Sequence, residues 1–168
     1  MQNDTRQEIT WHKLIHANRM IPVPFQLTLA EQDYPVYCDE VVRIIPGKRL
    51  VAFGTWDDKP IVAKLFFEPA NAKRHAIREL LGIEALVTAH IPTPKLLYRG
   101  TVQKKRVQVL IFEKILNART LDEIWQEKTS PQELALLMYA VTIELATQHV
   151  LGIVQRDLHL KNLLLPFS

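Results

Sequence analysis

Residues 36–67 read VYCDEVVRIIPGKRLVAFGTWDDKPIVAKLFF, and this run sets the architecture of the chain. It contains three segments rich in β-branched and aromatic residues, separated by two short turns of proline, glycine and aspartate. Such runs, bounded by such residues, are typical of β-strands, and short turns join strands that pair antiparallel. The run therefore predicts three consecutive antiparallel strands, at 36–45, 49–56 and 61–67.

The sequence after this run extends the sheet and inserts one helix. Between about 71 and 89, residues recur at spacings of three and four, which predicts a helix with one inward face. The positions that form this face are Ile77, Leu80, Leu81, Glu84 and Val87. Pro92 and Pro94 end the helix, and residues 95–102 and 106–115 read as two more strands. We therefore expect an α+β fold whose residues 36–114 form an antiparallel five-stranded lobe with one inserted helix.

The segments before residue 36 and after residue 114 have different sequence patterns from the predicted sheet. Residues 1–35 are punctuated by prolines, and we expect an N-terminal arm or short helix there. Thr120 with Glu123, and Ser130 with Glu133, form capping boxes that predict two helix starts. The second helix extends to about His149, and Gly152 after it favours a left-handed stop. We expect its apolar stripe to be core, and this stripe comprises Leu134, Leu137, Met138, Val141 and Leu145.

Residues 155–162, QRDLHLKN, follow the second helix and precede an apolar run. Asp157 stands five residues before Asn162. This spacing resembles the catalytic loop of protein kinases, in which the aspartate is the base for an acceptor hydroxyl and the asparagine binds magnesium. The structural alternative is a loop in which both side chains cap backbone groups. The resemblance makes Asp157 a candidate catalytic base and Asn162 a candidate metal ligand.

Other parts of the same template lie upstream in the matching order. Lys64 stands on the third predicted strand, and a cation among apolar strand residues is costly without an anionic partner or ligand. Glu79 on the following helix is the first candidate partner, and Glu84 is the rival. The end of the fifth strand, around Glu113 to Ile115, is the candidate hinge whose backbone binds an adenine edge.

These stretches resemble bacterial protein-kinase-like phosphotransferases of the lipopolysaccharide kinase group, the Kdo and core-heptose kinases. The resembling segments are RIIPGKRLVAFGTW, IVAKLF, RELLGIEALVTAHIPTPKLLYRG and QRDLHLKNLLL, within about residues 41–168. The resemblance implies a two-lobed ATP-dependent kinase that phosphorylates a hydroxyl of a sugar or other small substrate, with a hinge at about 113–116. By position, it implies that Lys64 binds the nucleotide phosphates, Glu79 orients Lys64, Asp157 is the base and Asn162 binds Mg²⁺.

The sequence departs from this family pattern in two places. The turn Pro46-Gly47-Lys48-Arg49 has one glycine where protein kinases carry three, so Lys48 or Arg49 is expected to supply charge toward phosphate. The chain also ends six residues after Asn162, ahead of the second metal-binding aspartate that a kinase needs. We therefore expect residues 117–168 to be a C-terminally truncated helical lobe. The alternative function is a catalytically inactive kinase-like protein that at most binds nucleotide or a partner protein, with self-association through its exposed apolar helix.

Composition limits the remaining function classes. The 168 residues carry a net charge of +3, and the lone Cys38 excludes an internal disulfide. No apolar run reaches the length of a membrane span, and the first residues lack a signal-peptide pattern, so we expect a cytoplasmic protein. The basic triplet Lys104-Lys105-Arg106 reads as a solvated turn between strands. We therefore expect no nucleic-acid partner, while the family resemblance implies peripheral association with the inner membrane.

Overall fold

The computed structural model describes residues 7–102, 104–127, 130–155 and 158–167. The candidate catalytic base, Asp157, lies outside the described residues. Within them the fold is mixed α+β, as the sequence predicts. None of the helices described there combines the length and the hydropathy that a membrane span requires.

The chain divides into two compact units, which are described separately. The first unit combines the described residues of 1–83 with 94–114, and the second combines 84–93 with those of 115–168. The first contains a large β-sheet, and the second contains helices and a two-stranded sheet.

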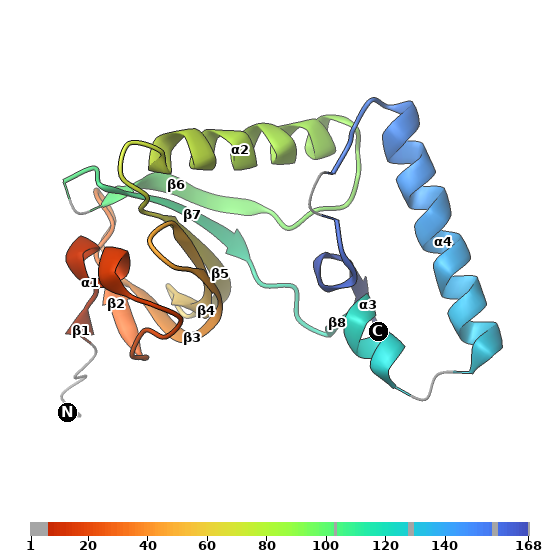
Figure 1. Cartoon of the computed structure of the whole chain (residues 1–168), viewed down its shortest axis with the longest axis horizontal. Helices are drawn as coiled ribbons and strands as arrows, with labels where there is room; N and C mark the ends of the chain where they lie inside the picture. The colour runs from red at the N-terminus through yellow and green to blue at the C-terminus, as the bar shows by residue number, and fades with distance from the viewer. Residues whose placement is uncertain (1–6, 103, 128–129, 156–157, 168) are drawn as a thin grey trace. The chain divides into compact units, whose positions relative to one another are not determined.

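Among the described residues, the sheet of the first unit has seven strands in the order β1-β2-β3-β4-β5-β7-β6 (Figure 1). Only the β1–β2 pair is parallel, and every other neighbouring pair is antiparallel. The five predicted strands lie consecutively in this order, within a residue or two of the predicted bounds. The strands are β1 Gln7–Glu8, β2 Phe25–Leu27, β3 Val36–Ile45, β4 Arg49–Trp56, β5 Lys59–Phe66, β6 Leu96–Val102 and β7 Val107–Glu113.

The predicted count of five strands is wrong, because the N-terminal segment adds two strands to the sheet edge. The segment also contains the helix α1, Trp11–His16, whose N-cap is Thr10. Strand β2 is only three residues long, and it pairs with β3 through Phe25 opposite Cys38 and Leu27 opposite Val36. A strand this short has no readable alternation, so its pairing depends on tertiary burial of Phe25 and Leu27.

Alternation along the strands gives the sheet two apolar faces, and each packs against one helix. One face forms the larger core cluster with α1, to which Leu14 contributes a fully buried side chain. The other face forms a smaller cluster with the helix α2, Ala72–Thr88. Successive residues of β5 point to opposite faces, so Ala63 and Leu65 belong to the first cluster and Val62 and Phe66 to the second.

Helix α2 forms where the sequence predicts it, but its predicted inward face is partly wrong. Ile77, Leu81 and Val87 are exposed. The residues that pack on the sheet are Ala72, Ala76, Leu80 and Ile83. The small side chains of Ala72 and Ala76 let the first turns of the helix approach the strands closely. A prediction based on large apolar residues does not include alanines, so it misses this part of the inward face. Three residues of the predicted inward face therefore lie on the exposed side of α2.

The second unit contains both predicted capped helices. Both capping boxes form, and Gly152 has a positive φ of 76°. The apolar run after the candidate loop forms a strand that pairs antiparallel with a strand before the first of these helices. The elements are β8 Ala118–Thr120, α3 Leu121–Gln126, α4 Pro131–Val150, a 3-10 turn η1 Leu160–Asn162 and β9 Leu164–Pro166.

Candidate functional site

Lys64 lies in the middle of the sheet, on the face that α2 covers. It pairs with Val51 of β4 and with Leu110 of β7, so strands flank it on both sides. Its side chain retains 31% of its exposure. A partly buried cation on a sheet face is costly without an anionic partner close by.

That partner is Glu79 of α2, whose carboxylate contacts the Lys64 ammonium in a short ion pair. The Glu79 side chain is 28% exposed, so both charges are largely withdrawn from solvent. Lys64 Nζ also lies 5.1 Å from the centre of the Phe112 ring, a cation–π distance. Glu84, the rival partner, is exposed. The helix phase explains the choice, because Glu79 precedes the inward-facing Leu80 and Ile83.

Half-buried apolar side chains surround this ion pair on the same sheet face. Val51 lies directly opposite Lys64, and Phe53 lies opposite Val62 in the β4–β5 register. The ammonium of Lys114, the residue that follows β7, lies 3.8 Å from the centre of the Phe53 ring. The first unit thus presents a charged pair beside a partly exposed apolar surface.

Lys48, which we expect to supply charge toward phosphate, lies in the turn between β3 and β4 and forms an ion pair with Glu68. The distance from Lys48 Nζ to Glu68 Oε1 is 3.7 Å, and the Lys48 carbonyl accepts backbone hydrogen bonds from Phe67 and Glu68. The other Glu68 oxygen is hydrogen-bonded to His75 Nε2 at 2.6 Å. This hydrogen bond and the nearby Lys48 charge lower the pKa of Glu68. Sequence reasoning missed Glu68 and His75, whose seven-residue separation across a turn into α2 gives no recognised pattern.

The candidate hinge residues have well-defined backbone hydrogen bonds. The Glu113 N–H donates to the Lys95 carbonyl at 3.0 Å, and the Lys114 N–H donates to the Pro60 carbonyl at 3.2 Å. The Glu113 carboxylate accepts from the Lys95 N–H at 2.7 Å. Of the three residues, only Ile115 has an N–H without a backbone acceptor among the described residues. An adenine edge at this segment would therefore receive its hydrogen bond from Ile115.

The candidate loop in the second unit is described on both sides of its aspartate. Asn162 ends η1 and is exposed, and its N–H donates to the His159 carbonyl at 2.8 Å. Gln155, at the start of the loop, donates through Nε2 to Oε1 of Gln148 at 2.7 Å. Lys161 Nζ lies 3.7 Å from Asp122 of α3. These contacts fix the two ends of the loop onto α4 and α3.

The candidate metal ligand Asn162 has no cluster of acidic, histidine or cysteine side chains around it in the described part of the chain. No group of three or more His, Cys, Asp or Glu side chains gathers there as a ready-made site. The Asn162 amide oxygen belongs to the hard oxygen ligands that Mg²⁺ accepts. The metal-ligand role of Asn162 stays a prediction, as do the nucleotide-binding roles of Lys64, Glu79, Lys48, Glu113 and Ile115.

Among known proteins, similarity to this chain is found in solved structures, and it is weak. No protein-family model matches the chain, and no curated protein matches it. A solved structure titled vaccinia related kinase 3 matches with 9% identity and a TM-score of 0.42. The match covers 71% of this chain and 38% of that one, so the chain spans well under half of the matched structure's length. A similarity of this size does not establish a family, and the lipopolysaccharide kinase resemblance rests on its sequence motifs alone.

Proposed function

We propose that this chain binds ATP and acts as a phosphotransferase of protein-kinase-like fold. The observation that carries the proposal is the ion pair of Lys64 on β5 with Glu79 on α2. A lysine held in place by one carboxylate presents a fixed positive charge to phosphate oxygens. The apolar residues beside it, Val51, Phe53 and Val62, provide the kind of surface that buries a planar base.

The proposed reaction needs few covalent participants. An acceptor hydroxyl oxygen attacks the γ-phosphorus, the bond between that phosphorus and the ADP oxygen breaks, and the hydroxyl proton passes to the Asp157 carboxylate. Lys64 stabilises the negative charge on the phosphate oxygens, while Glu79 keeps the ammonium in position. Bound Mg²⁺ would neutralise phosphate charge, and Asn162 is the residue that would hold it.

The acceptor in this proposal is a hydroxyl of a sugar of the lipopolysaccharide type or of another small molecule. The loop motif QRDLHLKN supports this substrate class through its similarity to the lipopolysaccharide kinases. A cytoplasmic location, with peripheral association at the inner membrane, belongs to the same proposal.

Nucleotide binding is tested by thermal shift with Mg-ATP on the wild type and on Lys64→Met. A ligand that binds only the folded state raises the melting temperature, so we expect a rise in the wild type and a lost or much smaller rise in the variant. Lys59→Met is the matched control, because Lys59 begins the same strand and forms only an exposed pair with Asp57 at 3.6 Å. An equal rise in all three proteins would contradict nucleotide binding at Lys64.

Phosphoryl transfer is tested separately, with sugar acceptors, on the wild type and on Asp157→Ala. Loss of a general base lowers turnover by about 10²–10⁴-fold. Stabilisation by Mg-ATP with no turnover in the wild type would instead support the alternative, an inactive nucleotide-binding protein. Turnover that survives both Lys64→Met and Asp157→Ala would contradict the kinase-like mechanism.

A further inference from the structure

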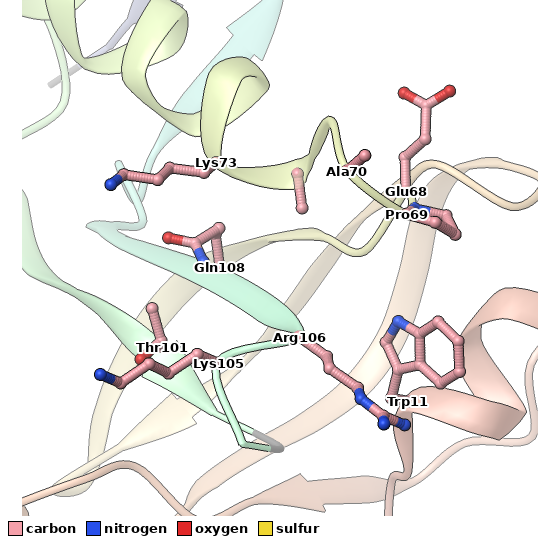
Figure 2. Close-up of a pocket in the computed structure, with 10 residues that line it drawn as sticks. Trp11, Glu68, Pro69, Ala70, Lys73, Thr101, Lys105, Arg106 and Gln108 are labelled. Atoms are coloured by element: carbon pink, nitrogen blue, oxygen red, sulfur yellow. The ribbon is translucent and has the colours of Figure 1, made fainter.

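A pocket of about 690 Å³ lies in the first unit, on the β6–β7 hairpin and beside the start of α2 (Figure 2). Three separate parts of the chain contribute its side chains. The residues used in the argument are Trp11, Lys73, Thr101, Lys105, Arg106 and Gln108. The volume lies within the range of pockets that bind small molecules. None of these residues belongs to the proposed ATP site.

Three cations line this pocket, and all three are available to a ligand. Within the described ranges, no carboxylate lies within 4.0 Å of Lys73, Lys105 or Arg106. Glu68 also lines the pocket, but its two oxygens are engaged by Lys48 and His75. Figure 2 shows the Glu68 carboxylate pointing away from Lys73 and Lys105. The pocket therefore has a net positive charge that no internal carboxylate neutralises.

The rest of the lining combines an aromatic surface with neutral hydrogen-bonding groups. The Arg106 guanidinium lies 4.9 Å from the centre of the Trp11 ring, so the ring and the cation form one wall. The Trp11 indole N–H donates to the Phe67 carbonyl at 3.2 Å, which holds the ring in place. Thr101 and Gln108 come from adjacent strands, and they lie in register opposite each other. In Figure 2 the Gln108 amide lies between Lys73 and Lys105 and Thr101 lies beside Lys105, on the other side of the pocket from Trp11.

We propose that this pocket binds a small molecule carrying a phosphate monoester on an apolar, preferably aromatic, body. Three unpaired cations suit a doubly charged group better than a single carboxylate, and each hydrogen bond to such a group is charge-assisted. Nucleic acid would call for a basic stripe along a surface, whereas here Lys73 and Lys105 lie on one side of a pocket of small-molecule size and Arg106 lies against Trp11 on the other (Figure 2). The prediction that Lys104-Lys105-Arg106 is a solvated turn holds for its backbone, since Lys104 and Lys105 have positive φ, but Lys105 and Arg106 line the pocket.

The test uses phenyl phosphate as the probe and the Trp11 indole signal in ¹H–¹⁵N spectra as the reporter, without ATP. Loss of one indole signal in Trp11→Phe assigns it against those of Trp56 and Trp125. We expect a saturable shift of the Trp11 signal, with weaker binding of inorganic phosphate and of uncharged benzyl alcohol. The double variant Lys73→Gln/Lys105→Gln should weaken phenyl phosphate binding at least about tenfold, because two charge-assisted hydrogen bonds are removed.

The control is Lys59→Gln/Lys95→Gln, which removes the same charge from two exposed lysines at the ends of β5 and β6 that lie away from the pocket lining. It should change the affinity for phenyl phosphate by less than about twofold, since exposed charges at a distance are screened. Equal weakening by both double variants would overturn the proposal in favour of general charge attraction. The proposal is also overturned if Trp11 shows no saturable shift, or if inorganic phosphate binds as tightly as phenyl phosphate. Because ATP is absent, failure here leaves the proposed kinase-like function unaffected.

Discussion

Gln155 donates a 2.7 Å hydrogen bond to Gln148, and this contact joins the start of the candidate loop to the last turns of α4. Gln148 is only 4% exposed, and its own amide lies 3.2 Å from a Glu144 carboxylate oxygen. A buried amide with both its donor and its acceptor engaged fixes the loop entry more firmly than an apolar contact, because side-chain hydrogen bonds are directional. The register of the loop relative to the helix therefore depends on this pair.

Replacing Gln148 by Leu should destabilise the second unit by about 1–3 kcal/mol, because the Gln155 amide loses its partner. The double variant Gln148→Leu/Gln155→Leu should recover part of this loss, since removing both partners leaves no unpaired polar group. Urea unfolding of the wild type, both single variants and the double variant gives the coupling free energy. Strictly additive effects would show that the two amides do not interact.

Removing the carboxylate of Glu79 should reduce stability by roughly 1 kcal/mol, because Lys64 is then partly buried without a counter-charge. Glu79→Ala and Glu84→Ala form a matched pair on the same helix, and Glu84→Ala should change the free energy of unfolding by less than about 0.5 kcal/mol. Chemical denaturation measures both. An equal loss in the two variants would mean that helix propensity, and not the ion pair, causes the effect.

Two glycines predict opposite responses to the same substitution. A Cβ at Gly54 would overlap the Tyr37 carbonyl oxygen and lie 2.9 Å from Cys38 Cα, because β3 passes close by at a register shift. Gly54→Ala should therefore destabilise the sheet by about 1–3 kcal/mol. Gly82 in α2 has nothing within 4 Å of its added Cβ, so Gly82→Ala should stabilise the helix by about 0.5–1 kcal/mol. Thermal unfolding of both variants tests the contrast, and a loss at Gly82 would contradict it.

The parts of the fold that the sequence predicts are those whose signal is local. Strands β3 to β5 are eight or more residues long, rich in β-branched and aromatic residues, and bounded by turn residues, so their ends follow from the sequence. The sequence favours Glu79 over Glu84 as the partner of Lys64, because the position of Glu79 ahead of Ile83 depends only on helix geometry. The structure confirms this pair. The capping boxes at Thr120 and Ser130 are local in the same way.

The parts that the sequence does not reveal depend on contacts between distant segments. Strand β2 is defined by its pairing with β3, and the inward face of α2 is defined by Ala72 and Ala76, which fit close against the strands. The pocket cations come from α2 and from the β6–β7 hairpin, so only the folded chain brings them to one surface. The same holds for Glu68 and His75.

The low pKa of Glu68 predicts a dependence of stability on acid pH. A carboxyl whose pKa is lowered in the folded state contributes stability above its unfolded pKa, and this contribution is lost as the pH falls through the folded value. The cause is chiefly the hydrogen bond with His75, followed by the charge of Lys48. The wild type should therefore be more stable than Glu68→Gln near neutral pH, and the difference should shrink as the pH falls below the ordinary pKa of a glutamate and through the lowered pKa of Glu68.

Melting temperatures of the two proteins across this pH range measure the effect. His75→Gln is the control, because it removes the principal cause of the shift while leaving the carboxyl in place. Its stability should lose part of the same pH dependence. A difference between the wild type and Glu68→Gln that stays constant with pH would contradict the role assigned to this carboxylate.

The exposed apolar face of α4 predicts self-association of the chain. Leu136, Tyr139 and Ile143 lie one to two turns apart and are 71%, 68% and 50% exposed. Exposed apolar side chains that share a helix face favour association, because pairing removes them from water. We therefore expect the mass measured by sedimentation to rise with concentration. Leu136→Glu/Ile143→Glu should suppress this rise, whereas Ala135→Glu/Thr142→Glu, with the same charge change at exposed positions to one side of this face, should retain it. Equal suppression by both pairs would point to net charge as the cause and would contradict association through this face.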